Sequence, residues 1–153
     1  MPRLSDVPPS AVALGFAGLL PFLWGVGTLY VPALVEVTMA TVGPRFVGPF
    51  VILVYGQIIL SFMSGVIWGF AAQAEGTVRA AGFALSVIPA LWAFFFVGGG
   101  PVSAAIYLIA GFAGLLLIDW FFWQNGLTPR WWMALRIPLT AGVCLCLAVV
   151  ALG

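Results

Sequence analysis

Long runs of apolar residues alternate with short polar segments along the whole chain. Each run is close to the roughly 20 residues that an α-helix needs to cross the hydrocarbon core of a bilayer. The runs fall at 10–30, 50–72, 80–97, 102–123 and 133–152. This pattern predicts an all-α fold, a polytopic transmembrane bundle of about five helices that forms one domain over residues 1–153.

The segment Val31–Val42, between the first two runs, carries one charge, Glu36, among apolar residues. This composition predicts a short helix that lies at the membrane interface or packs on the bundle.

Arginines in the short connecting segments predict the orientation. The N-terminal side holds Arg3, Arg79, Arg130 and Arg136, and the opposite side holds Arg45 alone. Because positively charged short loops stay in the cytoplasm, we expect the N-terminus there. With five helices, the C-terminus is expected on the far side.

The first apolar run has a competing interpretation as a signal peptide, with Arg3 as its charged n-region. The run is too long for that, and no small-x-small cleavage motif follows it closely, so we expect a retained helix. No Arg- and Ser-rich transit segment precedes it, which favours a multi-pass protein of the bacterial cytoplasmic (inner) membrane over a mitochondrial one.

Composition supports lipid as the solvent. The chain is 64% hydrophobic and 6% charged, against about 45–50% and about 25% in soluble domains. The net charge is +1 and no basic run exists, so nucleic acid is not an expected partner. The expected partners are membrane lipids and other integral membrane proteins.

The second run, 50–72, has the most informative pattern. Ser61, Gly65 and Gly69 recur every four residues and predict a small-residue face for close helix packing. An adjoining stripe holds Gln57, Ser61, Ser64 and Trp68. Its polar groups either bond to a neighbouring helix or form a small polar pocket for a head group, a quinone or a file of water.

Charged residues within membrane helices are candidates for a functional site, because burying a charge in lipid is costly. Asp119 and Arg136 lie near the cytoplasmic ends of the fourth and fifth helices and could pair across that hairpin, or each could extend separately toward the interface. Trp120, Trp123, Trp131 and Trp132 bracket the same interface, where an aromatic belt is the default explanation and a partner surface the alternative.

Recognisable catalytic, cofactor and metal sites are not found in the sequence. Histidine is absent, and helical geometry points Cys144 and Cys146 to different faces. No zinc-protease, nucleophile-elbow or phosphate-binding motif occurs. The sequence predicts no enzyme activity, no cofactor and no metal.

Five segments together resemble a family of small membrane proteins of proteobacteria and mitochondria, catalogued as a domain of unknown function, with animal relatives called transmembrane protein 69. They are Tyr55–Gly69, Gly18–Phe22, Ser86–Pro89, Asp119 and Leu135–Thr140. Many members carry a histidine before the tryptophan of the first segment, where this chain has Ile67. The resemblance implies a membrane location and no established reaction.

The functional expectation is association. We expect an accessory, stabilising or assembly subunit of a larger cytoplasmic-membrane complex, respiratory or photosynthetic. The alternative is a small transporter or a lipid- or quinone-binding membrane protein that uses the stripe around Ser61 and Ser64.

Overall fold

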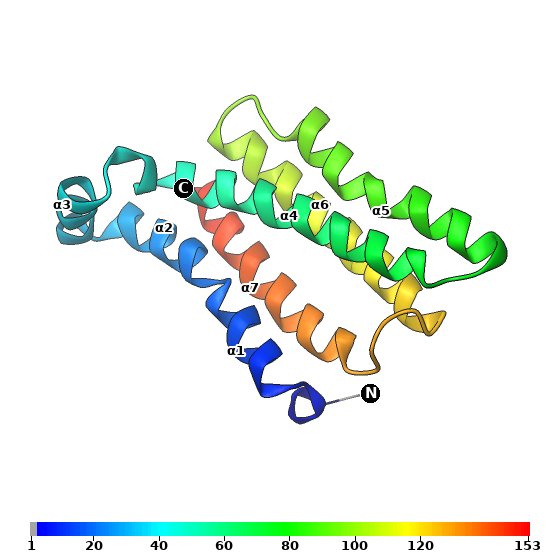
Figure 1. Cartoon of the computed structure of the whole chain (residues 1–153). Helices are drawn as coiled ribbons and strands as arrows, with labels where there is room; N and C mark the ends of the chain where they lie inside the picture. Colours follow the sequence, from blue (N-terminus) through cyan, green and yellow to red (C-terminus); the bar gives the residue numbers. More distant parts are fainter. Residues whose placement is uncertain (1–2) are drawn as a thin grey trace.

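The computed structural model describes residues 3–153, which contain seven α-helices and two short 3-10 helices (Figure 1). In chain order these are η1 (Leu4–Asp6), α1 (Pro9–Ala17), α2 (Leu20–Tyr30), α3 (Pro32–Thr41), η2 (Pro44–Phe46), α4 (Pro49–Ala72), α5 (Gly76–Phe96), α6 (Pro101–Gln124) and α7 (Trp132–Leu152).

Five stretches are long and apolar enough to cross a membrane: Pro9–Tyr30, which joins α1 and α2, and the helices α4, α5, α6 and α7. Each has 21 to 24 residues, or about 31 to 36 Å of helix, which matches a hydrocarbon core of about 30 Å. The predicted all-α polytopic bundle is confirmed.

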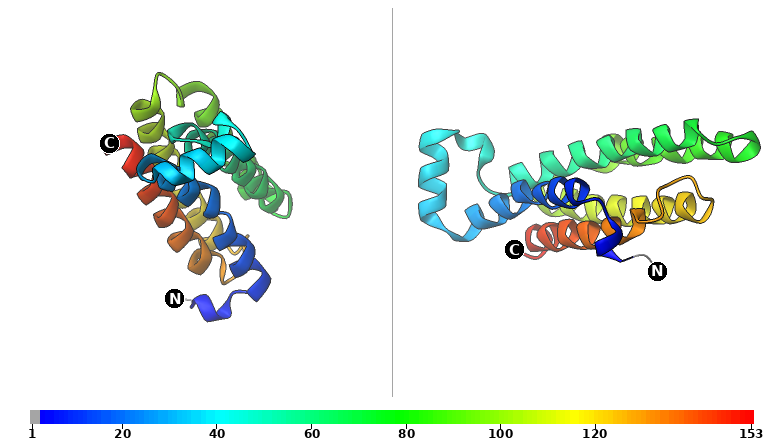
Figure 2. Two further views of the ribbon diagram at one scale, coloured as in Figure 1. Left: turned by 90° about the vertical axis from the view of Figure 1, so that its left-hand side faces the viewer. Right: turned by 60° about the horizontal axis from the view of Figure 1, so that its bottom comes forward.

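The helices lie in two layers around a shared core (Figure 2). α4 and α5 pack together in one layer, α6 and α7 pack together in the other, and α2 packs on α4 and α7. The core contains nine large apolar side chains that are almost completely buried: Phe22, Ile52, Leu60, Ile67, Leu108, Phe112, Leu115, Phe122 and Leu147.

The first crossing consists of two helices, α1 and α2, with a break near its middle. The sequence predicted one continuous helix over 10–30, so the prediction was wrong on this point. Gly18 and Leu19 form a turn between α1 and α2. Pro21 follows this turn, and because it lacks an N–H it cannot donate to the carbonyl of Ala17 as an uninterrupted helix requires. As a result α1 packs on α7, whereas α2 packs mainly on α4.

Two other predicted segments, α5 and α3, can be compared with the structure. α5 begins at Gly76 and not at residue 80, because Arg79 interrupts the apolar run but, as a good helix former, does not interrupt the helix. The helix predicted within Val31–Val42 is present as α3, and it lies across one end of the bundle (Figures 1 and 2).

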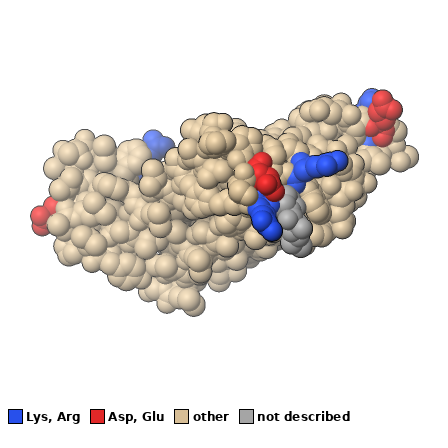
Figure 3. Space-filling view, turned by 90° about the horizontal axis from the view of Figure 1, so that it is seen from below, with Lys and Arg blue, Asp and Glu red and all other residues tan. Residues whose placement is uncertain are grey.

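In the view of Figure 3 the charged side chains lie near the left-hand end, at the right-hand tip and in a group near the middle of the face, with uncharged surface between these groups. Such uncharged surface is expected to contact lipid tails. Two of the described charged residues lie in the interior of the bundle: Asp119 is completely buried and Arg136 is almost completely buried.

Candidate functional site

The most polar part of the interior lies where α6 and α7 approach their shared connection. Asp119 of α6 has no exposed surface. Its Oδ2 accepts a hydrogen bond from Arg136 Nε at 2.7 Å, and its Oδ1 accepts one from Trp132 Nε1 at 2.8 Å. The structure therefore brings the sequence-predicted pair Asp119 and Arg136 together as a buried ion pair.

The depth of the pair follows from its place on the helices. Asp119 lies five residues before the end of α6 and Arg136 four residues after the start of α7, which is about 6 to 8 Å from each helix end. At this depth an unpaired charge would be costly. Mutual pairing allows both groups to remain buried.

The turn that connects α6 to α7 sets the register of the pair. The N–H of Leu127 donates to the carbonyl of Phe122 at 3.0 Å, and the N–H of Gly126 donates to that of Trp123 at 3.1 Å. Gly126 has a φ of +68°, which a residue without Cβ adopts without strain. The turn therefore ends α6 and reverses the chain.

Trp132, Arg136 and Thr140 follow one another at intervals of four and so lie along one face of α7. Arg136 is 6% exposed and Thr140 is 5% exposed. Among the described residues, Nη2 of Arg136 and Oγ1 of Thr140 have no hydrogen-bond partner. A buried polar atom without a partner costs about 1–3 kcal/mol. This face of α7 therefore carries two polar atoms that form no hydrogen bond within the described fold.

A cavity of about 230 Å³ lies beside these two groups. Arg136 and Thr140 line it, together with apolar side chains that include Phe22, Met63 and Phe112. A larger and almost wholly apolar cavity of about 470 Å³ lies between α2, η2 and α4. Tyr55 lines both.

The polar stripe of α4 is used differently. Gln57 Nε2 donates to the carbonyl of Val97 at 3.3 Å, and the hydroxyl of Ser64 donates to the carbonyl of Ser86. The ring of Trp68 packs on Phe83 with centroids 4.5 Å apart. The sequence left two interpretations open, and in the structure the polar groups of Gln57 and Ser64 bond to the neighbouring α5 and its C-terminal end. The side chains of this stripe line neither of the two cavities.

The small-residue face of α4 does not pack within the chain, so the prediction of close packing is wrong inside the described fold. A Cβ built at Gly65 or Gly69 meets nothing within 4 Å, and Ser61 is exposed. The reason is the position of these residues about 140° around the helix from the buried stripe that contains Leu60 and Ile67. Close approaches occur instead at Gly25, Gly82 and Gly111, where a Cβ would come within 3 Å of neighbouring side chains.

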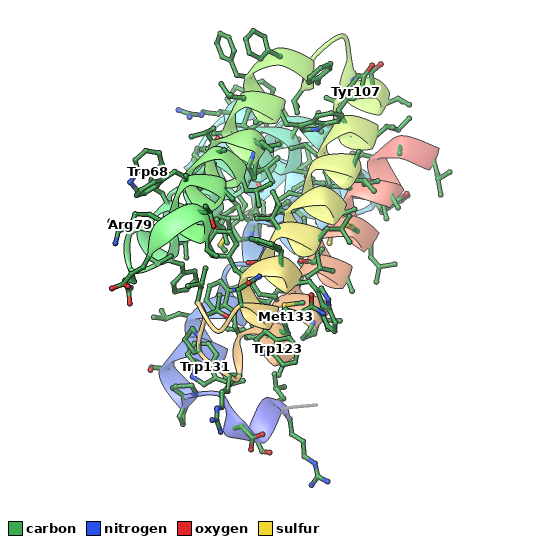
Figure 4. The ribbon with its side chains drawn as sticks, turned by 90° about the vertical axis from the view of Figure 1, so that its right-hand side faces the viewer. Trp68, Arg79, Tyr107, Trp123, Trp131 and Met133 are labelled. Carbon is green, nitrogen blue, oxygen red and sulfur yellow. The ribbon has the colours of Figure 1, made fainter. Side chains whose placement is uncertain are left out.

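Aromatic side chains gather at the connection between α6 and α7, where Trp123, Trp131 and Met133 lie near one another (Figure 4). Trp123 Nε1 donates to the carbonyl of Arg130 at 3.0 Å. Trp132, assigned to an aromatic belt from the sequence, instead donates into the buried pair. Its spacing of four from Arg136 was the signal that could have found both it and Thr140.

Cys144 is half-buried and Cys146 buried, both as free thiols within α7. Among residues 3–153, no group of three metal-ligating side chains comes together. Ile67 is completely buried in the core.

Comparison with known proteins gives a family and one informative relative. Residues 7–152 match the family described as protein of unknown function (DUF3429). The chain belongs to this family. It is 34% identical over 146 residues to transmembrane protein 69 of Xenopus tropicalis, across 90% of this chain and 51% of that protein.

This chain thus spans about half the length of that relative. No solved structure matches the chain. The resemblance stated from the sequence is confirmed by the family match.

Proposed function

We propose that this membrane protein acts by association, as an accessory, stabilising or assembly subunit of a larger complex in the bacterial cytoplasmic membrane, respiratory or photosynthetic. In this proposal it has no catalytic activity of its own. Its partners are other integral membrane proteins and the surrounding lipids.

The open glycine face of α4 is the observation that carries the proposal. Gly65 and Gly69 lie within a membrane-crossing helix and have open space where a Cβ would be. Helices associate in lipid through such faces, because apolar contact with lipid gives no drive for association and close backbone approach does. The fold already uses glycine in this way at Gly82 and Gly111, so the same device remains available on α4 for a partner helix.

The distribution of acids supports association over catalysis. Asp6, Glu36 and Glu75 are exposed, and Asp119 already accepts hydrogen bonds at both oxygens. General acid and base catalysis requires at least one such group within reach of a reacting atom. The alternative proposal, a transporter or lipid-binding protein that uses the stripe of α4, has less support because Gln57 and Ser64 already donate to α5.

The experiment is affinity purification of the tagged full chain from native membranes in mild detergent, with Gly65→Val and Gly69→Val compared with wild type. Gly114→Val is the matched control, because Gly114 also has open space at its Cβ position but lies on α6. We expect a stoichiometric membrane partner with wild type and the control, and its loss in the two α4 variants.

Native gels of wild-type and deletion membranes give the second readout. A larger complex should lose abundance when the gene is deleted. The proposal fails if every major complex migrates unchanged while a solute accumulates or fails to cross the membrane.

A further inference from the structure

We infer that the cavity beside Arg136 and Thr140 binds the carbonyl oxygen of an uncharged membrane amphiphile. The inference is independent of the proposed association, which concerns Gly65 and Gly69, because neither glycine lines the cavity. It depends on three observations: two unpartnered buried polar atoms, a neutralised guanidinium and an apolar cavity that opens at the lipid-facing surface.

The unpartnered atoms point to a ligand. Nη2 of Arg136 and Oγ1 of Thr140 lack partners among the described residues, and both side chains line the same cavity of about 230 Å³. They lie one helical turn apart on α7, so a single acceptor can be reached from both. One water occupies only about 30 Å³ of liquid, so a single bridging water would leave most of the cavity empty.

The charge of the ligand follows from the ion pair. Arg136 is already neutralised by Asp119 through Nε at 2.7 Å. A full anion would add net negative charge next to the Asp119 carboxylate in a region of low dielectric, which is unfavourable. A carbonyl oxygen accepts a hydrogen bond from Nη2 and from the threonine hydroxyl without adding charge.

The shape of the ligand follows from the lining. Apart from Arg136, Thr140 and Tyr55, the lining side chains are apolar. Leu14 of α1 and Phe62 of α4 also line the cavity and are 76% and 64% exposed. The cavity therefore reaches the uncharged surface between α1 and α4, where an apolar tail would continue into the bilayer.

The volume limits what enters. At about 230 Å³ the cavity is smaller than the roughly 300–1,000 Å³ of sites that enclose a whole drug-sized ligand. It fits the head of an amphiphile whose tail stays outside. Carbonyl oxygens of this kind are carried by the ring of a quinone and by the ester groups of a diacylglycerol.

The test measures binding to the purified full chain in nanodiscs of ether-linked lipid, which lack ester carbonyls. The probes are decylubiquinone, dioctanoylglycerol and, as the control without a carbonyl, decylbenzene. The readout is a saturable rise in the unfolding temperature. We expect a rise with at least one carbonyl probe and none with decylbenzene, and the probe that binds identifies the source of the carbonyl.

Thr140→Val is the decisive variant, because it keeps the shape of the side chain and removes only the unpartnered hydroxyl. We expect probe affinity to fall about tenfold, as for the loss of one buried hydrogen bond. Arg136→Lys, which keeps the charge but removes Nη2, should also weaken binding. Thr41→Val is the matched control on exposed α3, where affinity should not change.

Two results would overturn the inference. One is that decylbenzene raises the unfolding temperature as much as the carbonyl probes do, or that no probe raises it. Either outcome would mean that water or lipid tails fill the cavity. The other is unchanged affinity in Thr140→Val with its unfolding temperature intact. Because no partner protein is present, failure here is distinguishable from failure of the proposed association.

Discussion

The two helical hairpins of the bundle satisfy their polar groups in different ways. Between α4 and α5, uncharged side chains donate to backbone carbonyls: Gln57 to Val97 and Ser64 to Ser86. Between α6 and α7, a carboxylate, a guanidinium and an indole bond to one another. Both donor atoms of the first contact, Gln57 Nε2 and Ser64 Oγ, have a partner, whereas the second contact leaves Nη2 of Arg136 without a partner in the described chain.

This difference in unused hydrogen-bond donors shows which of the two contacts could bind a ligand. The carbonyl of Ser86 lies within α5 and has a second lone pair for the bond from Ser64. The carbonyl of Val97, just past the end of α5, accepts from Gln57. The donor atoms of the α4–α5 contact are therefore partnered within the chain. A guanidinium has five N–H donors, and one carboxylate that also accepts from Trp132 cannot use them all. The α6–α7 contact is therefore the one that retains binding capacity.

The largest expected effect comes from breaking the charged contact. Asp119→Asn should destabilise the chain by about 3–5 kcal/mol, because it leaves a buried guanidinium without its counter-charge. The measurement is reversible unfolding in mixed micelles with increasing SDS fraction.

The double variant Asp119→Leu with Arg136→Met provides the control. It should recover most of that loss, since a buried pair replaced by apolar side chains of similar size is often neutral. Additive losses from the two single changes would show that the groups act independently.

The second effect tests close packing between α4 and α5. A Cβ on Gly82 would lie 2.9 Å from Ala71 Cβ and 3.2 Å from Phe122 Cζ. Gly82→Val should therefore cost about 1–3 kcal/mol through overpacking.

Gly65→Val, on the open side of α4, is the matched control for Gly82→Val. It should change the stability of the isolated chain by less than about 0.5 kcal/mol. Equal losses in both variants would mean that the glycine face is packed within the chain after all.

The sequence predicted membrane crossings better than it predicted which faces of the helices meet. Apolar run length depends on bilayer thickness alone, so all five crossings were found. Around α4, however, hydrophobicity is nearly uniform, so no polar side marks the lipid-facing surface. The pattern of Ser61, Gly65 and Gly69 predicts close helix packing but does not show which helix would pack there. Within the chain the close approaches occur at Gly25, Gly82 and Gly111.

The candidate site was predictable only where charge marked it. Asp119 and Arg136 stand out because charges are rare in apolar runs. Trp132 and Thr140 do not, because tryptophan suits a membrane interface and threonine can bond within its own helix. Their spacing of four from Arg136 places both on its face of α7, but only the fold shows that Trp132 donates to Asp119 and that Thr140 has no partner among residues 3–153.

A smaller effect is expected at the uncharged contact. Ser64→Ala removes a buried hydroxyl that donates to the carbonyl of Ser86. Its cost should be about 0.6 kcal/mol, the average for a hydrogen bond between membrane helices. Ser61→Ala, three residues away on the exposed side of α4, should be neutral in the same SDS titration. A cost for Ser61 equal to that for Ser64 would contradict the difference between the two sides.

The smallest expected effect, with the opposite sign, is at Thr140 in protein purified free of quinones and ester lipids. Ser64 and Thr140 are both 5% exposed, yet only the hydroxyl of Ser64 has a partner within the described chain. Thr140→Val should therefore leave stability unchanged or raise it by less than about 0.5 kcal/mol, because it removes a polar group that was buried without compensation. The SDS titration used for Ser64→Ala measures it directly. A loss as large as that in Ser64→Ala would mean that the Thr140 hydroxyl is bonded in the empty protein, and the contrast between the two hairpins would then not hold.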